Sequence, residues 1–114
     1  MHLYYKGYKH LDFPINVLYE ATHQKHVKTE TISPSKFYDK EEELNIIFDK
    51  IMSSGILTEI QSCIINQFYK EKYFMRQIAE IFNRSETYLV KEKRKALDMI
   101  YIKYGHEILK IVKG

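Results

Sequence analysis

Between residues 57 and 97, apolar side chains recur every three or four positions, and this spacing limits the segment to helices. Three helices are predicted there: one over about 58–69, one over 75–82 and one that begins at Glu86. A polar connection separates the first two helices, whereas only three residues separate the second from the third. The segment therefore predicts a set of short helices followed by a close helix pair.

Local signals mark where these helices begin and end. Thr58 and Gln61 form a capping box, in which the side chain of each residue pairs with the backbone of the other. Asn83 tolerates the left-handed backbone conformation of a tight turn, and Ser85 is a favourable N-cap. We therefore expect a tight turn between the second and third helices, with Glu86 as the first residue of the third.

Another helix is predicted to begin at Asp39. This residue is a suitable N-cap with Glu42 three positions later, and the acidic first turn favours the helix dipole. Four residues form the apolar face of the helix: Leu44, Ile47, Phe48 and Ile51. The helix should end at residues 53–55, where two serines and a glycine follow one another.

The first 38 residues carry weaker signals. A helix is predicted over about 15–28 with Asn16 as a candidate N-cap, and residues 29–36, with Ser-Pro at their centre, are predicted to be a turn or linker. We interpret residues 1–38 as a partly helical N-terminal extension of unknown role. Residues 39–114 then form the main domain.

The helix from Glu86 is predicted to be long, because residues spaced alternately by four and three continue it. They are Leu97, Tyr101, Tyr104, Ile108 and Ile111, and Gly105 is the weak point of this stripe. Two partners are considered for the stripe: the amino-terminal helices of the same chain, or a second copy in a homodimer. The predicted fold class is an all-α helical bundle with a long C-terminal helix.

Composition and missing motifs exclude several classes of protein. No apolar run approaches the ~20 residues of a membrane span, and the N-terminus lacks the apolar segment of a signal peptide, so we expect a cytoplasmic protein without a membrane role. Cys63 is the only cysteine, and His23 and His26 lack a third ligand nearby, so no metal site is predicted. No catalytic constellation or phosphate-binding loop is recognisable. We therefore expect neither an enzyme nor a cofactor.

Charge is distributed unevenly along the chain. Residues 39–59 carry two lysines and six acidic residues, whereas residues 60–114 carry eleven lysines or arginines and six acidic residues. The basic second half suits contact with phosphates, and the acidic segment should face away from them or toward another protein.

Ala79, Asn83 and Leu89 follow the spacing A-x3-N-x5-L, which is typical of a helix-turn-helix. The small residue allows the two helices to approach, and the leucine packs the second helix back into the core. In such a motif, the second helix presents its N-terminal residues to base edges in the major groove of DNA.

These residues resemble region 4 of bacterial sigma factors and the small phage or mobile-element regulators that share its fold. The matching segments are Leu57-Thr58-Glu59, Phe68-Tyr69, Gln77-Ile78-Ala79-Glu80-Ile81, Arg84-Ser85 and Ala96-Leu97. Where the family usually has a second apolar anchor, this chain has Glu92-Lys93, and Tyr88 and Val90 are expected to supply burial instead. The resemblance covers roughly the second half of the chain and implies a transcription regulator that binds specific double-stranded DNA sequences.

Residues on and before the helix from Glu86 are the candidate DNA contacts. The first two turns supply the candidate base contacts, which are Glu86, Thr87, Tyr88 and Lys91. The candidate phosphate contacts are Arg84, Lys93, Arg94 and Lys95.

A second function from a different class stays open. Sigma region 4 contacts RNA polymerase as well as DNA, so the resemblance also fits an interaction module that binds the polymerase or a sigma factor without reading DNA. The acidic segment 39–59 would suit such a protein contact.

Overall fold

The computed structural model describes residues 10–27 and 30–114. Every regular element within these residues is a helix and none is a strand, which confirms the predicted all-α class. The elements are α2 (Ile15–Thr22), α3 (Pro34–Tyr38), α4 (Glu41–Ser53), α5 (Glu59–Ile65), the π-helical turn η1 (Asn66–Lys70), α6 (Met75–Phe82) and α7 (Glu86–Lys113). None of the helices in this described part combines the length and apolar character of a membrane span.

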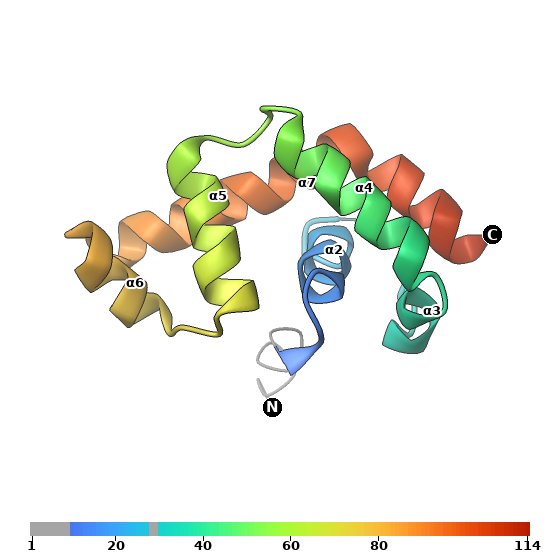
Figure 1. Ribbon diagram of the computed structural model, residues 1–114, viewed down its shortest axis with the longest axis horizontal. Helices are drawn as coiled ribbons and strands as arrows, with labels where there is room; N and C mark the ends of the chain where they lie inside the picture. The colour runs from blue at the N-terminus through green and yellow to red at the C-terminus, as the bar shows by residue number, and fades with distance from the viewer. Residues whose placement is uncertain (1–9, 28–29) are drawn as a thin grey trace.

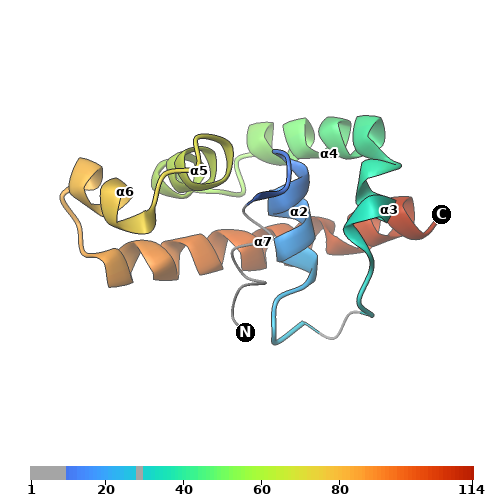
Figure 2. The same ribbon diagram turned by 90° about the horizontal axis from the view of Figure 1, so that it is seen from below.

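Helix α7 runs the length of the molecule, and the other helices lie along it (Figure 1). α5 and α6 pack against its N-terminal half, whereas α4 and α3 lie beside its C-terminal half. α2 crosses α7 between these two groups, as the view from below also shows (Figure 2). The long C-terminal helix of the prediction is therefore the central element of the fold.

Buried apolar residues form two clusters, and α7 contributes to both. The main cluster joins α2, α3, α4 and the Ile65–Tyr69 region to the part of α7 from Ala96 onward. The second cluster is smaller and joins α5 and α6 to the beginning of α7; its buried members are Ile64, Met75, Ile78, Ala79 and Leu89. The second cluster positions the first turns of α7, and the main cluster positions the rest.

The C-terminal stripe packs within the chain. Leu97 and Ile108 are buried in the main cluster, and Tyr104 and Ile111 are partly buried against it. Ile100 and Val112 are also buried there, because the buried face of a helix in a globular core is wider than the two-position seam of a coiled coil. A Cβ at Gly105 would lie 2.6 Å from Cδ1 of Tyr101. The absence of a side chain at Gly105 therefore leaves room for the Tyr101 ring to lie against the helix backbone.

Two predicted helix beginnings are wrong. Asp39 is the C-cap of α3, with a helical backbone, and Lys40 precedes the first turn of α4 without a side-chain cap. Asn16 lies inside α2, which begins directly after Pro14, and its Nδ2 donates to the backbone oxygen of Tyr69 at 3.0 Å. Asp39 instead ends the preceding helix, where its backbone N–H donates to α3, and the side chain of Asn16 instead pairs with a distant backbone oxygen.

The amino-terminal helices also differ in extent from the prediction. α2 ends at Thr22, and residues 28 and 29, where the predicted helix ends and the linker begins, lie outside the described residues. The rest of the predicted linker contains the beginning of α3, where Pro34 occupies the first turn and the Ser33 Oγ accepts from the backbone N–H of Ser35. Proline is well tolerated in the first turn of a helix, so Ser33-Pro34 marks the beginning of α3 and not the centre of a linker.

Candidate nucleic-acid interface

The turn between α6 and α7 is built as the sequence predicts. Asn83 has the left-handed values φ 54° and ψ 48°, and the Oγ of Ser85 accepts from the backbone N–H of Tyr88 at 3.1 Å. Ala79 and Leu89 meet in the second cluster on either side of this turn. The first turn of α7 is therefore capped and held against α6, with Glu86 as its first residue.

One face of α7 points outward at this end of the molecule. An open hollow of about 430 Å³ lies on it, lined by Glu86, Thr87, Val90, Lys91 and Arg94. Thr87, Lys91 and Arg94 are exposed and spaced by four and three residues, so they stand in one row. One turn further, Asp98 Oδ1 lies 2.9 Å from Nε2 of His26. The open row therefore ends where the segment after α2 reaches α7.

Arg84 and Tyr88 contact each other beside this row. The guanidinium of Arg84 lies 5.0 Å from the centre of the Tyr88 ring, a cation–π geometry. Tyr88 and Val90 are partly buried against the second cluster, as expected from the missing apolar anchor. Tyr88 does not line the outward hollow, so its ring serves packing and the Arg84 contact.

Glu92 is the buried residue that takes the anchor position. Its Oε1 accepts from Gln61 Nε2 at 3.1 Å, and its Oε2 lies 3.3 Å from Nζ of Lys95. Gln61 also belongs to the predicted capping box of α5, in which its Oε1 accepts from the backbone N–H of Thr58 at 3.1 Å. This chain of contacts ties α7 to the beginning of α5 and satisfies the buried carboxylate.

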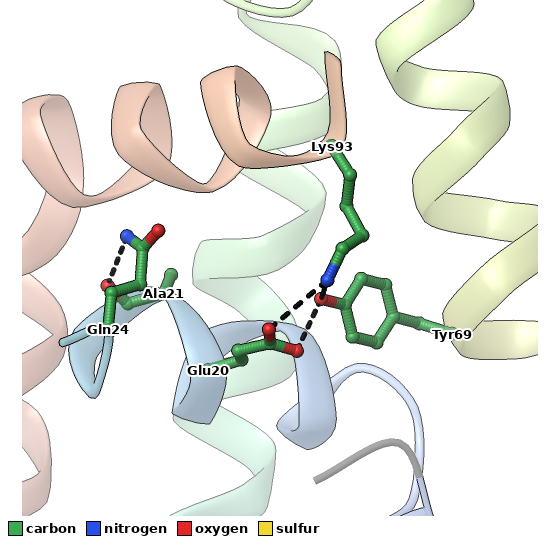
Figure 3. A network of polar contacts seen from close by, with 5 residues as sticks. All are labelled: Glu20, Ala21, Gln24, Tyr69 and Lys93. Carbon is green, nitrogen blue, oxygen red and sulfur yellow. Dashed lines mark hydrogen bonds and ion pairs between the residues drawn. The ribbon is translucent and has the colours of Figure 1, made fainter. Parts of the chain in front are cut away.

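Lys93 points toward α2 and not along the outward row. Its Nζ lies 3.2 Å from Glu20 Oε2 and 3.4 Å from the hydroxyl of Tyr69, and its side chain is only 16% exposed (Figure 3). The same Nζ lies 4.9 Å from the centre of the Phe68 ring. Of the predicted phosphate contacts, Lys93 is thus engaged inside the protein, while Arg84, Arg94 and Lys95 are exposed.

Tyr69 completes this internal network. Its hydroxyl donates to Glu20 Oε1 at 2.5 Å. Burial raises the pKa of Tyr69 well above its usual value of 10, and the nearby charge of Glu20 raises it further. The phenol therefore stays protonated and remains a hydrogen-bond donor, which leaves the carboxylate of Glu20 held from two sides.

Comparison of the chain with protein-family models, with curated proteins and with solved structures finds no match. Among the residues described, no group of three or more His, Cys, Asp or Glu side chains is placed to hold a metal ion.

Sequence reasoning missed Glu20 and Tyr69 as parts of this region. They lie 73 and 24 positions from Lys93, and no local pattern connects residues so far apart. One signal was present: Glu92 and Lys93 occupy positions where an apolar anchor is usual. Charged residues at inward positions require buried partners, and the structure supplies them as Gln61 and Glu20.

Proposed function

We propose that this protein is a sequence-specific double-stranded DNA-binding regulator of transcription, in which α6 and α7 act as a helix-turn-helix. The observation that carries the proposal is the outward row on α7. It presents Thr87, Lys91 and Arg94 on the first turns of a capped helix, which is the part that such motifs place in the major groove.

Some side chains in and beside this row suit contacts to bases, and others suit contacts to phosphates. Lys91 matches the acceptor atoms of guanine, Thr87 offers a hydroxyl and a methyl group, and Glu86 can accept from cytosine. Arg94, with Arg84 and Lys95 at the edges, would contact phosphates, which position the protein without reading sequence. Three phosphate contacts give a slope of log affinity against log salt of roughly −3.

The resemblance to sigma region 4 supports the same proposal. Two of its matching segments, Gln77-Ile78-Ala79-Glu80-Ile81 and Arg84-Ser85, lie on either side of the α6–α7 turn, where Ala79 also packs against Leu89. The proposed site omits Lys93, because its ammonium is paired with Glu20.

The test is selection of bound sites from a random duplex library at about 150 mM salt, where nonspecific binding is already weakened. We expect an enriched motif with the native chain and its loss with Lys91→Ala/Arg94→Ala. The matched control is Lys103→Ala/Lys110→Ala, which removes the same charge from exposed positions near the other end of α7 and should keep the motif. An inverted repeat would indicate a homodimer, and a single asymmetric motif a monomer. Absence of enrichment with the native chain would contradict the proposal.

An exposed apolar surface on α6 favours a second candidate function. Phe74 and Ile81 are 67% and 57% exposed, and Ile81 lines a hollow with Tyr73, Gln77 and Glu80. Phe74 and Ile81 are seven positions apart, which places them on one side of the helix, and contiguous exposed apolar patches often mark protein contacts. The candidate is a module that binds RNA polymerase or a sigma factor without reading DNA. Phe74→Ala/Ile81→Ala should abolish regulation in that case, and Lys91→Ala/Arg94→Ala should leave it intact.

A further inference from the structure

Lys93 and Glu20 form a shielded pair at the crossing of α2 and α7 (Figure 3). Their side chains are 16% and 21% exposed, whereas the Lys50–Glu107 pair between α4 and α7 is 60% and 48% exposed. The carboxylate of Glu20 is also fixed by the hydroxyl of Tyr69. Lys93 is therefore held toward α2 by an acceptor that cannot easily follow it outward.

A small hollow connects this pair to the outward row. It has a volume of about 130 Å³ and is lined by Glu20, Gln24 and Leu97 together with Val90, Lys93 and Arg94. Val90 and Arg94 also line the larger hollow on the outward face of α7. The ammonium of Lys93 is thus separated from the proposed DNA-facing surface by one open space beside Arg94.

A phosphate and the carboxylate of Glu20 would compete for this ammonium. Both are anionic oxygen acceptors, and lysine acts toward either as a compact charge on a flexible stem. Glu20 has the advantage in the structure, because it is preplaced at 3.2 Å and partly shielded from water. We propose that Glu20 is a positioning residue that withholds Lys93 from DNA and so sets the number of phosphates the protein neutralises. This inference rests on the proposed function.

Salt dependence distinguishes this role from a purely structural one. Each phosphate contact adds about 0.9 to the magnitude of the slope of log affinity against log salt. Glu20→Gln keeps an oxygen that accepts from Tyr69 but removes the charge that holds Lys93. We expect its slope to be steeper than the native slope by about 0.9, so its affinity should fall about 3.5-fold more between 50 and 200 mM salt.

The measurement is fluorescence anisotropy with a labelled random-sequence duplex of about 30 base pairs, using the full chain. Lys93→Gln should keep the native slope, because Lys93 makes no phosphate contact while Glu20 is present. Glu20→Gln/Lys93→Gln should also have the native slope. Glu107→Gln is the matched control: it removes one carboxylate from an ion pair with Lys50 near the other end of α7, and its slope should not change. Circular dichroism checks that each variant is folded.

Two results would overturn the inference. A native slope in folded Glu20→Gln would mean that Lys93 does not reach a phosphate when it is released. A shallower slope in Lys93→Gln alone would mean that Lys93 already contacts a phosphate beside Glu20, and this variant tests the inference even if Glu20→Gln does not fold. The proposed function fails separately, when the native chain enriches no motif from the random duplex library or when Lys91→Ala/Arg94→Ala enriches the same motif as the native chain.

Discussion

Leu89→Ala tests whether the second cluster holds α7 in place. Leu89 is fully buried in that cluster, and Leu→Ala changes at such positions cost 2–5 kcal/mol through lost burial and the remaining cavity. The second cluster has few other members to close the gap, so we expect a loss of about 3 kcal/mol. A domain of this size has a free energy of unfolding of about 5–15 kcal/mol, so the change is a large fraction of the total.

Urea denaturation followed by far-ultraviolet circular dichroism measures this loss. With an m value of about 1.5 kcal/mol/M, the midpoint should fall by about 2 M. Ile46→Ala is the control, because Ile46 is 69% exposed on α4, and its cost should stay within about 0.5 kcal/mol. A loss below about 1 kcal/mol for Leu89→Ala, or an equal loss for Ile46→Ala, would refute the assigned role of the second cluster.

Three further changes test the turn, one cap and one histidine. Asn83→Ala should lower the free energy of unfolding by about 1 kcal/mol because of its left-handed backbone, whereas Asn83→Gly should be nearly neutral in the same urea assay. Thr58→Ala should cost about 1 kcal/mol through loss of the capping box, and Thr58→Ser, measured alongside it, should recover most of this. Burial lowers the pKa of His23 below its usual 6.5, and its Nε2 accepts from the backbone N–H of Ile32 at 3.0 Å. The stabilisation of the folded state by neutral His23 is therefore complete above about pH 6.5 and is lost as the pH falls through the lowered pKa. His23→Phe should reduce the loss of stability between pH 7 and 5. The control His106→Gln, at an exposed position, should leave that loss unchanged.

Signals that act within one helical turn could be predicted from the sequence. The capping box of Thr58 and Gln61, the left-handed Asn83 and the Ser85 cap each depend on residues no more than three positions apart. Asp39 shows the limit of this reasoning. Its sequence pattern fits an N-cap, but Asp39 is the C-cap of α3. No local signal indicates whether it ends one helix or begins the next.

Long-range pairing is the part of the site that could not be predicted. Arg94 and Lys93 are adjacent basic residues in one charged run, yet Arg94 is exposed and Lys93 is paired with Glu20. Helical geometry turns neighbouring residues by about 100°, so adjacent positions face different surroundings. Which direction meets α2 depends on how the two helices cross, and that crossing is decided by the whole main cluster.

Helix α7 makes the two ends of this molecule mechanically dependent on each other. Its 28 residues span about 42 Å at 1.5 Å per residue, which is close to the 43 Å longest dimension of the chain. A rigid rod transmits rotation along its whole length. A turn of about 10° about its axis moves a side-chain tip some 6 Å from that axis by about 1 Å. A contact near Lys113 that rotates α7 about its axis would thus move Thr87, and the second cluster, which holds Leu89, would have to shift with it.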